Sequence, residues 1–274
     1  MQAPVQPQMI QAPRMQQFGS PYEALGSLAC IEVQEKANLL QGISAAIGVE
    51  IDTANKYKVL DADGVEYFYV VEQTDFCTRQ LKRGMCADCV GWNADVLFTY
   101  GAHQGALPQQ FLHLQRDHSL TCCCFNRPIV DIVDVMSGQK IGSIKDPFAL
   151  CDLTFSLMDA SGDEALFAKG GCCQCGLCCP LPCGPCSTVH FDISNAKSGQ
   201  VVGFLDKEVP SCLKWLMPGA SVDNYKVNFQ GVQHPQWKAM LMVLSVFIDF
   251  RYFSETQDPS DIGNDGLLGM LNQS

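Results

Sequence analysis

Residues 237–253, WKAMLMVLSVFIDFRYF, form the stretch that decides the fold of this chain. Between Ala239 and Ile248 only Ser245 is polar, so a helix over these residues has no polar face and must be buried. These ten residues, rising ~1.5 Å each, reach roughly 15 Å, about half of the ~30 Å hydrocarbon core of a bilayer. Charged residues bracket the run, and charges are costly inside lipid. We therefore expect a helix buried in a protein core.

Short strand patterns alternate with turn signals upstream of this stretch. They predict four hairpins, formed by 57–60 with 65–71, 129–136 with 140–144, 153–158 with 164–168, and 189–193 with 200–205. Further strands are predicted at 28–33 and 223–229, whereas 36–47 fits either a helix or a strand. Several short strands separated by turns indicate a sandwich or a closed barrel. The single apolar helix at the end of such a chain favours strands wrapped around that helix.

Composition and charge exclude some classes of partner. The net charge of −11 argues against nucleic-acid binding, which needs a basic face, and against attachment to anionic lipid by charge alone. The first twenty residues lack the basic and apolar regions of a secretory signal. Without export, the 16 cysteines are expected to be mainly thiols, lipid anchors or metal ligands rather than disulfides.

The two ends of the chain differ in composition from the part between them. Residues 1–22 are rich in Gln and Pro and are expected to form a disordered tail. Pro4 and Pro7 form one PxxP, which fits an SH3- or WW-type partner, although a solvated tail is the simpler interpretation. Residues 256–274 are expected to be a flexible acidic tail, which leaves 23–255 as one folded domain.

Five segments follow one another in an order that is specific as a set. They are Asn55-Lys56-Tyr57, EQTDFCTR at 72–79, Cys122-Cys123-Cys124, Asp223-Asn224-Tyr225, and 237–253 with its Ile248-Asp249-Phe250. Together they resemble the phospholipid scramblase family over most of residues 25–255. The resemblance implies a mainly β, tubby-like fold: a closed antiparallel barrel of about twelve strands around a hydrophobic C-terminal helix at 236–253. It also implies ATP-independent, bidirectional movement of phospholipids between leaflets, at the cytoplasmic face of the plasma membrane.

The resemblance assigns a role to the cysteine triplet. In the family such a cluster carries thioester-linked palmitate, which makes Cys122, Cys123 and Cys124 candidate lipid anchors. Each buried CH₂ contributes ~0.8 kcal/mol, and stable anchoring takes at least two signals. The alternative is a set of buried or idle thiols. Three adjacent cysteines cannot all point into one core, which favours acylation.

A second cysteine-rich segment, GCCQCGLCCPLPCGPC at 171–186, holds seven cysteines. Two C-x₂-C pairs, Cys175/Cys178 and Cys183/Cys186, have the spacing of zinc ligands. Only four residues separate the pairs, which is closer than in ordinary zinc ribbons. The composition favours a surface loop with room for further acylation over a structural zinc site.

The resemblance also implies an EF-hand-like calcium loop before the helix. Its ligand positions fall on Ser221, Asp223, Tyr225, Val227, Phe229 and Val232. Asp223 is the one carboxylate among them, and position 12, which needs a bidentate acid, is Val232. We therefore carry over Asp223 alone as a Ca²⁺ ligand. The alternation at Tyr225, Val227 and Phe229 is typical of a β-strand.

No catalytic constellation stands out, so we do not expect an enzyme. The sequence contains no P-loop, GxSxG or HExxH motif, and His190 on a polar strand face is interpreted as solvated. Two other hypotheses stay open beside lipid transport. One is a palmitoylated, membrane-associated adaptor that signals without transport, and the other is a zinc-stabilised binding module.

Overall fold

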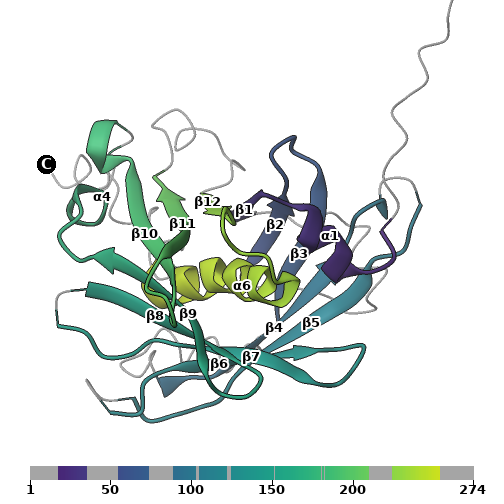
Figure 1. Cartoon of the computed structure of the whole chain (residues 1–274), viewed down its shortest axis with the longest axis horizontal. Helices are drawn as coiled ribbons and strands as arrows, with labels where there is room; N and C mark the ends of the chain where they lie inside the picture. The colour runs from purple at the N-terminus through teal and green to yellow at the C-terminus, as the bar shows by residue number, and fades with distance from the viewer. Residues whose placement is uncertain are drawn as a thin grey trace, which may run out of the picture.

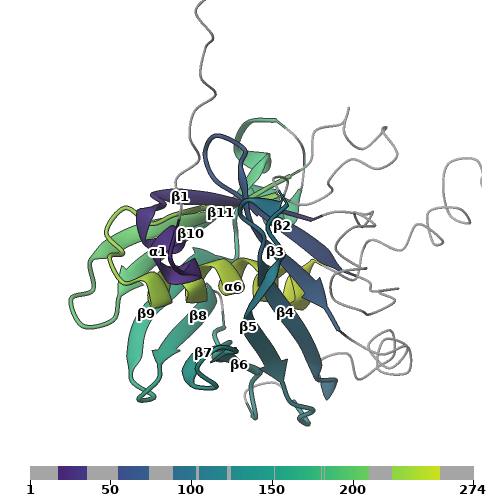
Figure 2. The same ribbon diagram turned by 90° about the vertical axis from the view of Figure 1, so that its right-hand side faces the viewer.

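The computed structural model describes residues 18–35, 55–73, 89–102, 105–121, 125–150, 152–179, 181, 183–209 and 224–253. Twelve strands in these ranges form one closed antiparallel barrel, in which each strand pairs with its neighbours along the chain. The last strand pairs with the first and closes the barrel. A single long helix runs through the interior (Figure 1, Figure 2). The predicted fold class is therefore confirmed.

The elements follow one another in simple order. The strands are β1 (Cys30–Glu35), β2 (Lys56–Leu60), β3 (Glu66–Glu72), β4 (Trp92–Phe98), β5 (Gln109–Arg116), β6 (Ile129–Asp134), β7 (Lys140–Lys145), β8 (Asp152–Asp159), β9 (Glu164–Gly171), β10 (Thr188–Asn195), β11 (Val201–Glu208) and β12 (Asn224–Asn228). The helices are α1 (Pro21–Ser27), the single-turn α4 (Cys175–Cys178), the 3₁₀ turn η3 (Gly184–Cys186) and α6 (Pro235–Tyr252).

All four predicted hairpins are present, as β2–β3, β6–β7, β8–β9 and β10–β11. The strand predicted at 28–33 begins at Cys30, because Leu28 caps the C-terminus of α1. The strand predicted at 129–136 ends at Asp134, whose carboxylate accepts hydrogen bonds from the backbone of Met136 and Ser137. Strands β4 and β5 and helix α1 were not predicted individually. Segment 36–47 and the PxxP at Pro4 and Pro7 lie outside the described residues.

Helix α6 is buried on every side from Lys238 to Asp249, as its lack of a polar face predicts. Its side chains belong to one hydrophobic cluster with side chains of the barrel strands. The Phe247 ring, for example, lies 6.0 Å from the Phe155 ring of β8. Gly142 in β7 makes this packing close, since a Cβ there would lie 2.4 Å from the Met240 sulfur. The hydrophobic core is thus the layer between the helix and the wall of the barrel.

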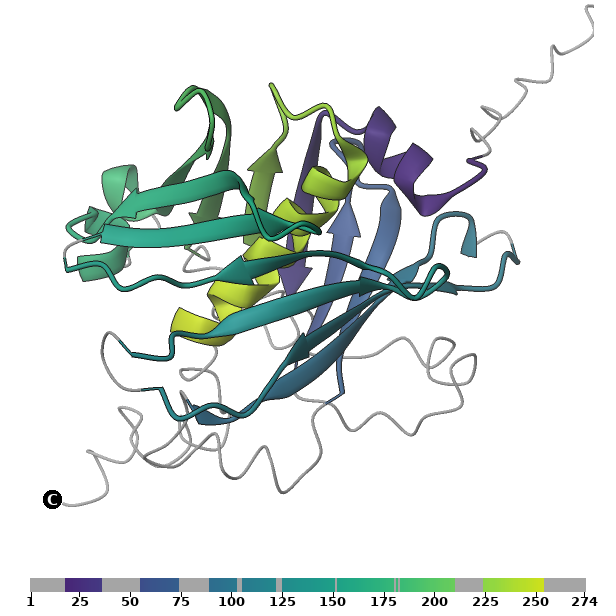
Figure 3. The same ribbon diagram turned by 60° about the horizontal axis from the view of Figure 1, so that its bottom comes forward.

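Connections alternate between the two ends of the barrel, because consecutive strands are antiparallel. One end, called here the turn end, carries four connections of only four or five residues between strands. At the other end, the connection end, five of the six connections have twelve or more residues. Helix α6 enters at the turn end and finishes at the connection end (Figure 3). The barrel therefore has one compact end and one elaborated end.

Candidate functional site

All the site residues predicted from the sequence belong to connections at the connection end. Cys122–Cys124 fall between β5 and β6, the second cysteine-rich segment between β9 and β10, and Asp223 directly before β12. Cys122–Cys124 and Asp223 themselves lie outside the described residues, as do positions 74–79 of the EQTDFCTR segment. The up-and-down topology nevertheless brings these three connections, far apart in sequence, to one end of the barrel.

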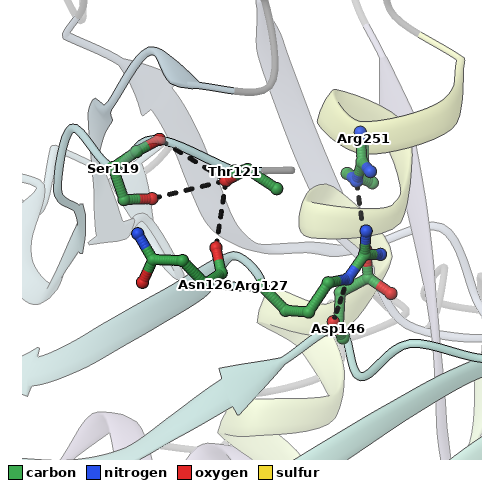
Figure 4. A network of polar contacts seen from close by, with 6 residues as sticks. All are labelled: Ser119, Thr121, Asn126, Arg127, Asp146 and Arg251. Atoms are coloured by element: carbon green, nitrogen blue, oxygen red, sulfur yellow. Dashed lines mark hydrogen bonds and ion pairs between the residues drawn. The ribbon is translucent and has the colours of Figure 1, made fainter. Parts of the chain in front are cut away.

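Hydrogen bonds join the two sides of the β5–β6 connection on either side of the cysteine triplet. The Thr121 hydroxyl donates to the Asn126 carbonyl at 3.1 Å (Figure 4). The Asn126 side-chain amide donates to the Leu120 carbonyl at 3.2 Å. Asn126 has a φ of 50°, a left-handed conformation that asparagine tolerates better than most residues. The described residues on the two sides of the triplet are therefore joined in a narrow, hydrogen-bonded base.

An ion-pair cluster ties this base to the rest of the connection end. Arg127 forms an ion pair with Asp146, which follows β7, and its Nε donates to the Asp146 carbonyl at 3.0 Å. The Asp146 backbone N–H donates to the Pro128 carbonyl at 3.1 Å. Arg251 of α6 donates from Nε to Asp146 Oδ2 at 3.1 Å (Figure 4). Asp146 is 2% exposed, so two arginines compensate its buried charge.

The C-terminal part of α6 is fixed by a second buried carboxylate. Asp249 accepts hydrogen bonds from the hydroxyls of Tyr57, at 2.5 Å, and Tyr225, at 2.7 Å. Burial, and then the charge of Asp249, raise the pKa of Tyr57 well above its ordinary value, which keeps this hydroxyl protonated as a donor. The two tyrosines come from β2 and β12, which both flank β1. They therefore hold the helix end against this side of the barrel.

These contacts explain the structural role of several of the sequence segments on which the family resemblance is based. Tyr57 belongs to Asn55-Lys56-Tyr57, Tyr225 follows Asn224, and Asp249 lies in Ile248-Asp249-Phe250. Asn55 also donates to Glu72, the first residue of EQTDFCTR, at 2.8 Å. The motifs are scattered along the chain, but their described residues gather where α6 ends. Their contacts position the helix in the barrel.

The segment before α6 does not fit a calcium loop. Tyr225, Val227, Phe229 and Val232, which occupy four of the ligand positions, are all buried in the hydrophobic core. Residues 224–228 form strand β12, which confirms the strand pattern predicted there. Side chains packed among apolar groups cannot supply the six to eight oxygens that Ca²⁺ takes.

The cysteine-rich segment between β9 and β10 lies on the barrel surface. Cys173, Cys175, Cys178, Cys179 and Cys183 are exposed free thiols. Burial, followed by the nearby thiols of Cys175, Cys179 and Cys183, raises the pKa of Cys186. In the part of the chain that the structure describes, no group of three or more His, Cys, Asp or Glu is arranged to hold a metal ion. Most of the thiols of this segment thus lie at the surface of the barrel.

Sequence reasoning did not identify Arg127 and Asp146 as site residues. They are 19 positions apart, and Asp146 is 105 positions from Arg251. Both stand next to a proline at a strand border, as Arg127-Pro128 and Asp146-Pro147, which was the one local signal. A border position gives no information about the partner, so the pairing could be found only from the folded barrel.

No helix among the described residues is long and apolar enough to cross a membrane. This agrees with the position of α6 inside the barrel. The predicted burial of this helix in a protein core is thus confirmed.

The sequence of this chain is similar to the sequences of known proteins. Phospholipid scramblase 2 of Bos taurus is 24% identical over 210 residues, which cover 76% of this chain and 64% of that protein. Phospholipid scramblase 1 of Mus musculus is 24% identical over 235 residues, covering 85% of this chain and 64% of that protein. The chain thus spans slightly less than two thirds of the length of these relatives. No solved structure matches it significantly. The sequence model of the family described as Scramblase matches residues 19–255, the whole barrel and α6, and the chain therefore belongs to the scramblase family.

Proposed function

We propose that this protein facilitates ATP-independent, bidirectional movement of phospholipids between membrane leaflets. The observation that carries the proposal is the family match over residues 19–255, which includes every described strand and α6. The names of the relatives, phospholipid scramblases 1 and 2, point to the same activity. The chain has no motif for ATP binding, so the movement would follow the lipid gradient.

We infer that α6 stays inside the barrel during this activity. The helix is held near both ends: Asp249 by two tyrosines, and Lys238 by the carbonyls of Gly26 and Leu28, at 2.9 and 2.6 Å. Withdrawal of the helix would leave these buried polar groups without partners, which costs about 1–3 kcal/mol for each group. Lipid movement is therefore assigned to the outside of the barrel rather than to an inserted helix.

Membrane attachment is the second part of the proposal. Palmitate on Cys122, Cys123 and Cys124 would hold the protein at the cytoplasmic face of the plasma membrane, which its charge of −11 cannot do. The exposure of Leu120 and Phe125, which border the triplet, supports this assignment. Labelling in cells with a clickable palmitate analogue tests it, and substitution of the three cysteines by alanine should remove most of the label. Substitution of Cys30, a half-buried thiol of β1, provides the control.

Calcium is given a minor role. Asp223 is retained as a Ca²⁺ ligand, but the buried side chains of β12 add no ligands beside it. We therefore expect weak binding at most and propose that scrambling proceeds without high-affinity Ca²⁺ control.

Reconstitution in liposomes tests the activity directly. A fluorescent phospholipid is placed in both leaflets, and a membrane-impermeant reductant then quenches the probe from outside. In protein-free liposomes only the outer leaflet reacts, whereas a scramblase exposes the inner leaflet as well. Measurements with and without Ca²⁺, repeated with Asp223→Ala, should give similar rates. Folded, membrane-bound protein that moves no more probe than empty liposomes would favour the palmitoylated adaptor instead.

A further inference from the structure

Four large apolar side chains are exposed on two connections at the connection end. Leu120 and Phe125, 79% and 72% exposed, lie on the β5–β6 connection. Phe148 and Leu150, 45% and 88% exposed, lie on the β7–β8 connection. We refer to these four residues as the apolar rim. No hydrophobic packing accounts for their position, because none of them belongs to the core cluster.

The two connections form one structural unit. Arg127 and Asp146 pair across them, and the Asp146 N–H donates to the Pro128 carbonyl, also across them. Phe125 lies two residues before Arg127, and Phe148 two residues after Asp146. The hydrogen bonds of Asn126 and Thr121 further hold the base of the first connection (Figure 4). These contacts therefore fix the backbone on which the rim residues stand.

The turn end shows a different distribution of exposed apolar residues. Val65, Leu107, Met136 with the neighbouring Val135, and Val201 at the start of β11 are exposed there, but they are divided among four different strand-to-strand junctions. Single exposed apolar residues of this kind are normal on a protein surface. At the rim, by contrast, residues 147–150 read PFAL, an unbroken apolar run with three exposed members. Exposed apolar residues gathered in this way mark an interaction surface.

The charge around the rim indicates the partner. Residues 118–130 and 147–150 contain no Asp or Glu, although the whole chain has a net charge of −11. Asp146 is buried and paired with two arginines, while Lys145 beside it is exposed. Asp117, just after β5, is the nearest exposed acid before this stretch, and the partly exposed Asp131 and Asp152, which follow the two segments, pair with Lys140 and Lys169. The rim is thus an apolar surface whose following acids are paired with basic residues, on an acidic protein, which suits the interfacial region of a phospholipid bilayer.

We propose that the apolar rim is a membrane-docking surface, which inserts Leu120, Phe125, Phe148 and Leu150 into the interfacial region of a phospholipid bilayer. The connection end, with the end of α6, then faces the membrane, and the turn end faces away. This orientation rests on the proposed function, since it places the barrel where lipids move. It does not depend on acylation, because the rim residues themselves contact the lipid.

Flotation of the purified, unacylated full-length chain with vesicles tests the proposal. The vesicles are phosphatidylcholine with or without phosphatidylserine, and the variant is Phe148→Asp with Leu150→Asp. The matched control, Leu107→Asp with Met136→Asp, adds the same charge at similarly exposed apolar positions of the turn end. The rim variant should lower the vesicle partition coefficient at least about tenfold, because each apolar side chain that leaves water stabilises the bound state. The control should bind like the wild-type chain.

The outcomes separate this proposal from the proposed function. Equal binding by the two variants, or no binding by the wild-type chain, would overturn the docking surface. Concentration-dependent dimers that the rim variant abolishes, with no vesicle binding, would overturn it in favour of contact between two copies. Leaflet exchange is measured on the same vesicles by the fluorescent probe. Wild-type protein that floats through the rim but moves no lipid would leave the docking surface standing and reject transport.

Discussion

The short turns at the turn end of the barrel are stabilised by residues that are neighbours in sequence, whereas the connections at the other end depend on contacts between distant segments. The β2–β3 turn is typical of the first kind: Asp61 accepts hydrogen bonds from the backbone of Asp63 and Val65, and Gly64 takes a φ of 78°. In the β8–β9 turn, Asp159 likewise accepts hydrogen bonds from the backbone of Ser161 and Asp163. The hydrogen bonds of each turn therefore join residues of that turn alone.

The connection end shows the second kind of stabilisation. Asp249 bonds to Tyr57, 192 positions away, and Arg251 bonds to Asp146, 105 positions away. Such contacts exist only when the barrel has closed around α6. The structure of the connection end therefore depends on closure of the whole barrel. A change in the rim connections acts directly on the end of α6, because Arg251 contacts Asp146.

Replacement of Asp249 by alanine should break the connection end most severely. The hydroxyls of Tyr57 and Tyr225 would lose a shared acceptor inside the core, and we expect a loss of about 4 kcal/mol in the free energy of unfolding. The midpoint of urea denaturation measures it. Asp249→Asn, which keeps one acceptor oxygen, should lose less than half as much. Equal losses in the two variants would show that charge, rather than hydrogen bonding, holds the helix end.

A pair of Asp→Ala substitutions compares the two ends directly. Asp146→Ala leaves Arg127 and Arg251 without their common partner and should cost about 3 kcal/mol. Asp159→Ala removes two turn hydrogen bonds and should cost about 1 kcal/mol. In hydrogen exchange, Asp146→Ala should speed exchange in both rim connections and in the last turn of α6, whereas Asp159→Ala should affect only its own turn. If Asp146→Ala also speeds exchange only around its own position, the two ends of the barrel do not differ in this way.

The same difference decides how much could be predicted from the sequence. The four hairpins have short turns, and α6 is recognisable because its apolar run has no polar face. Strand β4 was missed because Ala94 to Leu97 are all buried, including Asp95, so the two-residue alternation of a half-buried strand is lost. Strand β5 follows a ten-residue connection without a tight-turn signal. The Arg127–Asp146 pair has no local signature at all, because it depends on barrel closure.

The smallest expected effect concerns the pH dependence of the barrel wall near the connection end. His190 of β10 is half-exposed and lies 2.5 Å from Asp206 of β11 and 3.2 Å from Asp192. Partial burial lowers the pKa of His190, but hydrogen bonds to Asp206 and Asp192 outweigh it, and the net shift is upward from 6.5.

A raised folded-state pKa stabilises the protein fully below the unfolded value, and this contribution is lost as the pH rises through the folded value. We expect it to be below about 1 kcal/mol, because exposed ion pairs are screened by solvent. In the wild-type chain, denaturation midpoints should fall slightly as the pH rises from 6.5 through the raised pKa of His190. They should change less in His190→Asn. Asp206→Asn, which removes the carboxylate 2.5 Å from His190, should flatten the slope in the same way, and an unchanged slope in this variant would show that the β10–β11 pair is not its source.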